Sequence, residues 1–398
     1  MDRKVRTAVV GCGAISDIYL TNMMKKYSTL EVVSCAAAHL ESAQKKAKEY
    51  GIRACTYDEI LADDSIELVV VLTPAPTHFE LIRQALEAGK HVYTEKTLTD
   101  RLEDGKVLLD LAREKGLLLG AAPETFLGSC FQTARKAIDD GLIGEVTSFT
   151  VCANRNIDLL ASIFTFLRMP GGGICYDYGV YYLTALVSLL GPVDRVSAVV
   201  ENRKKVRTNI FPQSPEFGKE YTYDNESQVT AILKMESGVA GTLTLNGESL
   251  MKDLGVFTIY GTKGVLFLGD ANQFGGEVQY IPEITGMEDM DRDNRRTLEP
   301  VSDLSDNCRG IGPAEMARAI LRAGKAQGGE TGKTAGKSPE MPRIRVDVTM
   351  AYHVLDTICQ IMKSGGTDRM EHVESTCERP EAFTDWKELI AEKREGSC

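Results

Sequence analysis

Residues 4–16 read KVRTAVVGCGAIS, a run rich in β-branched residues that leads directly into two closely spaced glycines. The run predicts a strand, and the residues after it predict the start of a helix. Gly11 allows the tight turn, and Gly13 lets the backbone approach an anion at the helix N-terminus, where free N–H groups and the helix dipole attract negative charge. Ser16 replaces a third glycine and is still small enough for close helix–strand contact. The pattern predicts a dinucleotide-binding turn with the contacting residues Gly11, Cys12, Gly13, Ala14 and Ile15.

Strand and helix patterns alternate through the first third of the chain. The segment SIELVVVLTP is continuously apolar, which is typical of a parallel strand covered on both faces. Gly51 and Gly89 mark the ends of two helices. The alternation predicts a doubly wound parallel sheet, a Rossmann domain, over residues 1–123. Its further strands are expected at 30–38, 65–74, 91–96 and 117–123, and its helices at 14–26, 41–51, 77–90 and 102–116.

The rhythm changes after residue 123. A helix is expected over 130–144, and strands with period-two alternation and hairpin-type turns follow it. This pattern favours helices packed over an antiparallel sheet, in an α+β domain that spans residues 124–398. Two more helices are expected at 314–324 and 346–366, and the polar stretches 285–310 and 324–343 are expected to be surface loops.

Composition restricts the possible partners. The chain has 398 residues, a formal net charge of −11 and 43% hydrophobic residues. The negative charge argues against nucleic acid and anionic membranes as partners, and no apolar run approaches the ~20 residues that span a bilayer. The first residues lack the features of a signal peptide. The ten cysteines are scattered singly and the five histidines lack ligand spacing, so we expect free thiols in a reducing cytoplasm and no metal site.

The adenosine end of the cofactor site leaves two cofactors open. An acidic residue after the second strand usually binds the ribose 2′-hydroxyl of NAD. Here that strand ends in three alanines followed by His39, and the first acid is Glu41. The missing acid removes a repulsion against a 2′-phosphate, and His39 or Lys45 could assist its binding. The sequence therefore favours NADP slightly over NAD.

Two groups of residues follow strands of the predicted sheet, where ligands of doubly wound folds bind. Thr73, Pro74 and His78 follow one strand, and Glu95 and Lys96 follow the next. A lysine cation there could polarise a substrate hydroxyl or lower the pKa of a neighbouring acid–base group. His78 could instead be a helix N-terminal residue without chemistry. We count all five as candidate cofactor-binding residues.

A triple glycine, Gly171–Gly173, precedes an acid and a phenol. Asp177 and Tyr181 are four residues apart, so on a helix they share one face and could form a proton-transfer site. The alternative is an ordinary helix whose tyrosines, Tyr178 and Tyr182 among them, pack in the core or line a substrate pocket. The candidates for binding substrate hydroxyls are Asn154, Arg155 and Arg168.

Together these motifs resemble the Gfo/Idh/MocA family of glucose–fructose oxidoreductase and inositol dehydrogenase. The resemblance rests on GxGxxS at the N-terminus, TPxxxH from Thr73 to His78, Glu95-Lys96-Thr97, and GGGxxxDxGxY from Gly171 to Tyr181. It implies a Rossmann domain followed by a domain with a large, open, mostly antiparallel sheet that is often used for oligomerisation. It also implies a nicotinamide cofactor and hydride transfer to or from an alcohol carbon of a sugar, glycoside or cyclitol. By the same resemblance Lys96 and Tyr181 are catalytic, with Asp177 orienting the lysine or the substrate.

The chain departs from the common family pattern at two positions. Tyr181 replaces the usual histidine, which resembles the branch that contains glucose–fructose oxidoreductase. A phenol has a reference pKa of about 10, so Tyr181 would need Lys96 or the cofactor's positive ring to act near neutrality. Thr97 replaces a proline and removes a rigid φ after the lysine. The expected function is an NAD(P)-dependent sugar oxidoreductase that forms homo-oligomers; a redox-assisted lyase or glycosidase and a non-catalytic nucleotide sensor are the alternatives.

Overall fold

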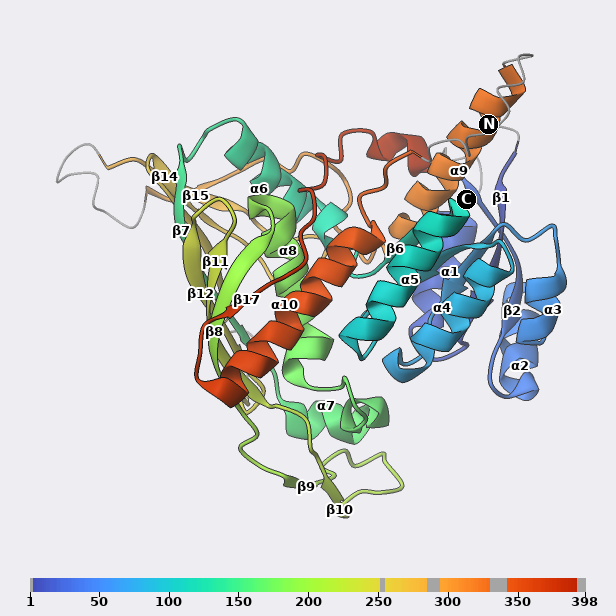
Figure 1. Ribbon diagram of the computed structural model, residues 1–398, viewed down its shortest axis with the longest axis horizontal. Helices are drawn as coiled ribbons and strands as arrows, with labels where there is room; N and C mark the ends of the chain where they lie inside the picture. Colours follow the sequence, from blue (N-terminus) through green and yellow to red (C-terminus); the bar gives the residue numbers. More distant parts are fainter. Residues whose placement is uncertain (1–2, 251–254, 285–293, 330–341, 392–398) are drawn as a thin grey trace, which may run out of the picture. The chain divides into compact units, whose positions relative to one another are not determined.

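The computed structural model of the protein describes residues 3–250, 255–284, 294–329 and 342–391. These residues form two compact units, which can be followed by label and colour in Figure 1. Unit 1 contains the residues up to Glu124, Cys308–Ala351 and the residues from Phe383 on, and unit 2 contains Thr125–Asn307 and Tyr352–Ala382. The chain therefore passes between the units four times. This differs from the expected continuous second domain over 124–398.

Unit 1 is built on a six-stranded parallel sheet with the order β3-β2-β1-β4-β5-β6. The order reverses between β1 and β4, which is the place where doubly wound folds bind ligands. The predicted parallel Rossmann fold is confirmed. Its strands are β1 Val5–Val10, β2 Leu30–Ala36, β3 Arg53–Ala54, β4 Leu68–Val71, β5 His91–Thr94 and β6 Leu119–Ala121, and its helices are α1 Ser16–Lys25, α2 Leu40–Tyr50, α3 Tyr57–Ala62, η1 Ala75–Thr77, α4 His78–Glu87, α5 Leu102–Lys115, α9 Ile311–Gly329 and η7 Trp386–Leu389.

Local sequence signals explain the helix ends. Helix α2 ends at Gly51, which has a φ of 68° in the left-handed region, as its predicted role requires. Helix α3 begins at Thr56, whose side chain forms a capping box with Glu59. The sequence analysis missed α3 and the two-residue strand β3 because both are short.

Late segments of the chain complete unit 1. Helix α9 packs against β1, β2, β6 and α1. A Cβ added to Gly120 in β6 would lie 2.6 Å from the sulfur of Met316 in α9, so this glycine permits the close approach. The N–H of Ala121 donates to the carbonyl of Val346 at 2.9 Å. These contacts explain why the chain returns to unit 1, and they leave no local trace in the sequence.

Unit 2 is built on a nine-stranded sheet with the order β16-β15-β14-β13-β7-β12-β11-β8-β17. Only the β7–β12 pair is parallel, which agrees with the expected mostly antiparallel sheet. The short hairpin of β9 and β10 lies beside α7 (Figure 1). The strands are β7 Val146–Asn154, β8 Val193–Glu201, β9 Val206–Thr208, β10 Glu220–Thr222, β11 Gln228–Met235, β12 Ala240–Asn246, β13 Val256–Gly261, β14 Gly264–Phe267, β15 Gln279–Pro282, β16 Arg296–Thr297 and β17 Glu371–His372; the helices are η2 Thr125–Leu127, α6 Ser129–Asp139, α7 Ile157–Ile163, η3 Thr165–Arg168, η4 Cys175–Gly179, α8 Val180–Leu190 and α10 Val348–Thr367.

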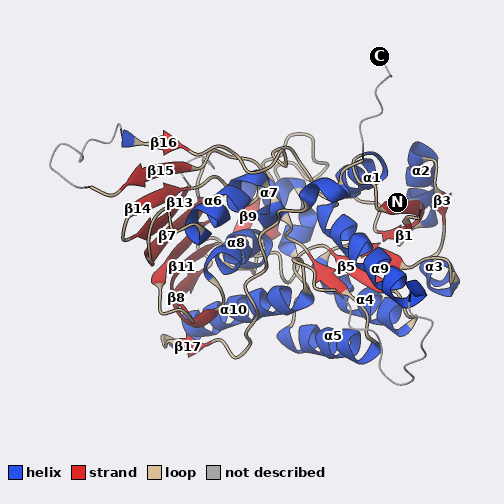
Figure 2. Cartoon of the chain, turned by 90° about the horizontal axis from the view of Figure 1, so that it is seen from above, coloured by secondary structure: helices blue, strands red, loops and turns tan. Residues whose placement is uncertain are grey.

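The two faces of this sheet differ. Helices α6, α8 and α10 all lie on one face, called the inner face here (Figure 2). Strand residues that point to it, such as Leu243 and Leu245, are fully buried. The other, outer face carries exposed apolar side chains, among them Val199 and Ile232. The expected loop segments 285–293 and 330–341 lie outside the described residues.

Candidate active site

The glycine-rich turn between β1 and α1 has the geometry of an anion site. Gly11 has a φ of 106°, and a Cβ there would lie 2.7 Å from the carbonyl carbon and oxygen of Leu72. Gly13 is exposed, and a Cβ there would meet no atom within 4 Å. The Ser16 hydroxyl donates to the Gly13 carbonyl at 2.6 Å and is buried beneath the turn. Backbone N–H groups at the start of α1 therefore face open space, which fits the pyrophosphate of a dinucleotide.

The residues expected at the adenosine end of the cofactor site are exposed. Strand β2 ends at Ala36, and the Cys12 thiol contacts the Ala36 carbonyl at 3.5 Å. His39 and Lys45 are both exposed, and His39 precedes α2 without capping it through its side chain. The structure thus leaves room for either nicotinamide cofactor at this end.

His78 connects two loops of unit 1. Its ring is fully buried, with Nδ1 2.7 Å from the Thr97 carbonyl and Nε2 2.7 Å from the Thr73 carbonyl. Burial lowers the pKa of His78. Because both nitrogens already contact backbone oxygens, the ring could touch a cofactor only if these loops opened. The geometry thus lets His78 position the two loops, and Thr73 and Pro74 beside it remain accessible; the cofactor contacts of all three residues stay predictions.

Glu95 and Lys96 stand at the carboxyl end of β5, on the same sheet edge as the Gly11 turn. The buried Glu95 carboxylate accepts from the Tyr19 hydroxyl at 2.7 Å and from the Lys96 N–H at 3.2 Å. The peptide bond between Lys96 and Thr97 is cis. Glu95 thereby links Lys96 to helix α1, which begins at the glycine turn. The Glu95 side chain is committed to these internal bonds, so cofactor contact at this position would fall to the backbone.

A second buried acid, Glu124, lies nearby and was not among the predicted site residues. Glu124 accepts from the Tyr93 hydroxyl at 2.7 Å and from the N–H groups of Gly310 and Gly312 at 2.6 Å each. Burial raises the pKa of Glu124 to about 7. Glu124 therefore fastens the segment through which the chain re-enters unit 1. The available signal was an acid placed directly after an apolar strand.

Asp177 and Tyr181 follow the triple glycine in unit 2. Asp177 lies in the π-helix η4, and Tyr181 lies in the first turn of α8. An α-helix was expected for this segment. In a π-helix the hydrogen bonds join residues five apart, so two residues that are four apart still lie within one turn. Asp177 is half-buried and Tyr181 is 7% exposed. The acid and the phenol thus occupy neighbouring positions on one helical segment.

The triple glycine serves close packing. A Cβ on Gly172 would lie 2.6 Å from the Leu167 carbonyl carbon, and one on Gly173 would overlap the Glu226 carboxylate. That carboxylate accepts from the Cys175 N–H at 2.9 Å, so it caps the segment that carries Asp177. Burial raises the pKa of Glu226. The sequence analysis did not identify Glu226, because it is about fifty positions away along the chain.

The three candidate substrate-binding residues have different surroundings. The Asn154 amide oxygen accepts from Asn246 at 3.2 Å on the outer face of the sheet, and its role in substrate binding stays a prediction. Arg168 donates to the Ala161 carbonyl and Glu216 and lies over the Tyr221 ring, which gives it a structural role. Arg155 lies beside Tyr178, which precedes Tyr181 by three residues: its guanidinium carbon is 3.5 Å from the centre of the Tyr178 ring.

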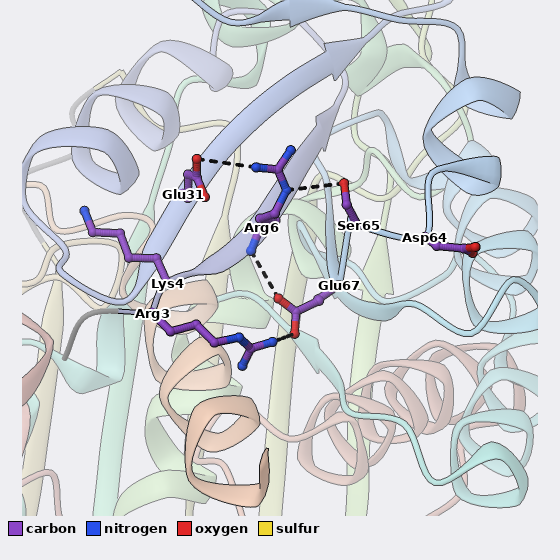
Figure 3. Close-up of a pocket in the computed structure, with 7 residues that line it drawn as sticks. All are labelled: Arg3, Lys4, Arg6, Glu31, Asp64, Ser65 and Glu67. Atoms are coloured by element: carbon purple, nitrogen blue, oxygen red, sulfur yellow. Dashed lines mark hydrogen bonds and ion pairs between the residues drawn. The ribbon is translucent and has the colours of Figure 1, made fainter. Parts of the chain in front are cut away.

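A shallow hollow of about 580 Å³ in unit 1 is drawn in Figure 3. Its residues lie around the amino ends of β1, β2 and β4, the edge opposite the Gly11 turn. Several of its charges pair with one another, as Arg3 does with Glu67, and Arg6 with Glu31 at 3.5 Å. The hollow is therefore separate from the candidate site. It is lined by Arg3, Lys4, Arg6, Glu31, Asp64, Ser65 and Glu67.

No three His, Cys, Asp or Glu side chains in the described part of the chain are grouped so that they could hold a metal ion. None of the described helices combines the length and the apolar character needed to cross a membrane.

Two family models match the chain. The model described as "Oxidoreductase family, NAD-binding Rossmann fold" matches residues 5–122, and "GFO/IDH/MocA C-terminal domain" matches residues 131–267. An "Uncharacterized oxidoreductase" of Schizosaccharomyces pombe is 32% identical over 51% of this chain and 56% of its own length, so the chain spans little more than half of that relative.

More complete matches cover the same architecture. The dTDP-3,4-didehydro-2,6-dideoxy-alpha-D-glucose 3-reductase of Streptomyces violaceoruber is 29% identical over 86% of this chain and 92% of its own. The scyllo-inositol 2-dehydrogenase (NAD(+)) of Bacillus subtilis is 26% identical over 68% and 75%. The solved structure of levoglucosan dehydrogenase with NADH has a TM-score of 0.74 at 19% identity, covering 94% of this chain and 100% of that one, and it supports the fold alone.

Proposed function

Since the chain belongs to the Gfo/Idh/MocA family of oxidoreductases with an NAD-binding Rossmann fold, we propose that it transfers a hydride between NAD or NADP and a secondary alcohol carbon of a sugar, glycoside or cyclitol. The observation that carries the proposal is the fixing of Lys96 at the ligand-binding edge of the sheet. Glu95 holds its backbone N–H, and His78 holds the following carbonyl of Thr97. The names of the reductase and the inositol dehydrogenase support an alcohol or ketone carbon as the reacting group.

Each candidate catalytic residue has its own role in the proposed reaction. A bound nicotinamide supplies the hydride acceptor or donor. The Lys96 ammonium donates to the oxygen of the reacting hydroxyl and stabilises the negative charge that develops there. The Tyr181 phenolate accepts the hydroxyl proton during oxidation, and the resulting phenol returns that proton during reduction. The Asp177 carboxylate accepts from a substrate hydroxyl and so orients the reacting group.

The proposal is tested by steady-state kinetics. Nicotinamide reduction is followed at its absorbance band with NAD⁺ and NADP⁺ against a panel of sugars, methyl glycosides and inositols. We expect Tyr181→Phe to lower kcat by about 10²–10⁴-fold, the usual contribution of a positioned acid–base group, with an unchanged Kd for the cofactor. Full turnover by Tyr181→Phe would contradict the assignment of Tyr181 as the acid–base group. Turnover without net reduction, together with solvent deuterium uptake beside the reacting carbon, would instead indicate a redox-assisted elimination.

We also propose a homo-oligomer formed through the outer face of the unit 2 sheet. Val199 and Ile232 are 60% and 52% exposed there, on neighbouring strands β8 and β11. Exposed apolar side chains grouped on one sheet face are typical of an interface. Ile232→Glu should shift the molar mass measured by light scattering toward the monomer. The nine free thiols among the described residues support a reducing compartment such as the cytoplasm.

A further inference from the structure

Asp270 lies in the loop after β14 and anchors a polar cluster in unit 2. Its Oδ1 accepts from the hydroxyls of Tyr178 at 3.0 Å and Tyr182 at 2.8 Å, and from the Asn272 N–H at 2.9 Å. Both phenols are buried, and burial raises their pKa values well above the ordinary range. They therefore remain donors at ordinary pH. These three bonds fix the position of the carboxylate through one oxygen.

The second oxygen of this carboxylate is engaged differently. Oδ2 has one partner among the described residues, Nη2 of Arg155 at the long distance of 3.4 Å. The Arg155 guanidinium carbon lies 3.5 Å from the centre of the Tyr178 ring, and the other side-chain contact of Arg155 is with the Asn154 carbonyl at 3.5 Å. The Asp270 and Arg155 side chains are 32% and 14% exposed. Both side chains are therefore partly accessible to solvent, and the long bond between Oδ2 and Nη2 leaves each group able to bind a ligand.

We infer that Asp270 and Arg155 form a hydroxyl-recognition pair that determines which substrates are accepted. A hydroxyl group both donates and accepts, so neighbouring hydroxyls on a ring can donate to Oδ2 and accept from the guanidinium. The cluster belongs to the segment that carries Tyr181, since the rings of Tyr178 and Tyr181 are 6.3 Å apart. The ligand class is therefore a cyclic vicinal diol. This inference rests on the proposed function, because it assigns specificity within that site.

The two carboxylate oxygens of Asp270 have different partners, which argues that this residue recognises a ligand and does not only support packing. A purely structural aspartate would use both oxygens in close bonds, as Glu124 does with its tyrosine and two backbone N–H groups. In Asp270 the bonds to Tyr178, Tyr182 and Asn272 are short, and the bond on the exposed side is long. Bonds to charged groups contribute most to discrimination when a ligand completes them.

The test compares Asp270→Asn with the wild-type enzyme. The amide nitrogen that replaces Oδ2 donates where the carboxylate accepts, while the amide oxygen can still bind the tyrosines. The parent substrate is the one among methyl β-D-glucopyranoside, myo-inositol and levoglucosan that gives the highest kcat/KM. The monodeoxy analogues of that compound are tested beside it. We expect kcat/KM for the parent to fall by about 10- to 100-fold, mainly through KM, which is the usual contribution of a charge-assisted hydrogen bond. For the analogue that lacks the recognised hydroxyl, variant and wild type should agree within about twofold.

Controls separate this outcome from a folding defect and from failure of the proposed function. Asp140→Asn changes an exposed aspartate directly after α6 and should leave every substrate unaffected. Equal losses for the parent and all deoxy analogues, or no loss at all, would overturn the inference. If the wild-type chain reduces neither NAD⁺ nor NADP⁺ with any polyol, the proposed function fails. The pair is then judged by saturation-transfer NMR with the same compounds: binding that Asp270→Asn abolishes supports it, and binding that is absent or unchanged overturns it.

Discussion

Replacing Gly173 by alanine directly tests how the Asp177 segment is positioned. The added methyl would overlap the Glu226 carboxylate, and the Gly173 carbonyl accepts from the Asp177 N–H at 2.8 Å. Overpacking at a closed position costs about 1–3 kcal/mol. Displacing the carboxylate also removes its bond to the Cys175 N–H, a loss of about 1 kcal/mol. We therefore expect the free energy of unfolding to fall by about 2–4 kcal/mol. A shift of about 1 Å at Asp177 would lower kcat by about 100-fold.

The assay combines urea unfolding with kinetics of nicotinamide reduction. Gly366→Ala is the matched control, because a Cβ there meets no atom within 4 Å and the residue lies in helix α10. It should leave activity unchanged and leave stability equal or up to about 1 kcal/mol higher. Glu226→Ala removes the overlap, so adding Gly173→Ala to it should cost little more. If the two substitutions were additive, or if Gly173→Ala behaved like the control, the steric reasoning would be refuted.

Three further outcomes are expected. Gly11→Ala should lower the Tm, because Gly11 has a positive φ and an added methyl would overlap the Leu72 carbonyl. The same variant should lower the affinity for NADH by about 10- to 100-fold in a fluorescence titration. Gly13→Ala, in contrast, should weaken NADH binding with little change in Tm. The pKa of Glu124 is raised from 4.5 to about 7, so the folded state binds this proton more tightly than the unfolded state does. The free energy of unfolding should therefore fall by up to about 3 kcal/mol as the pH rises from 4.5 to 7. Glu124→Gln should make that decrease smaller in urea titrations at several pH values. Arg207→Ala leaves two carboxylates without their fully buried guanidinium partner and should cost about 3–5 kcal/mol in urea unfolding, while a similar loss in the exposed control Arg203→Ala would contradict this reading.

The order of elements in unit 1 was predictable because each signal is local. The apolar runs of β1, β2, β4 and β5 and the intervening helical periodicity lie within windows of about ten residues. The return of the chain through α9 was not predictable. It depends on contacts such as that of Gly120 with Met316, which join positions far apart in the sequence.

The candidate site divides in the same way. The glycine turn and the motifs that contain Lys96, Asp177 and Tyr181 could be recognised in the sequence, because each motif is contiguous. The side chains that hold these residues in place, Glu226 among them, could not be predicted from the sequence. Asn154 is a case where a usable signal existed: the alternation of buried residues in β7 already places it on the face opposite its neighbour Ala153.

The Tyr178–Tyr182–Asp270 cluster needed the structure. Sequence spacing shows that the two tyrosines lie one helical turn apart, but not that a loop about ninety residues later supplies their acceptor. Its assembly depends on three elements converging on the inner face of one sheet. Long-range hydrogen bonds of this kind have no periodic signature.

The discontinuity of unit 1 has a consequence for biosynthesis. During translation the first 124 residues emerge from the ribosome long before Cys308–Ala351, which supply the helix packed on β1 and β6. The nascent Rossmann segment therefore waits, with apolar surface exposed, while nearly two hundred residues of unit 2 are made. Chaperone dependence should be greatest in that interval, and the cofactor turn should reach its final rigidity only after the last quarter of the chain has been synthesised.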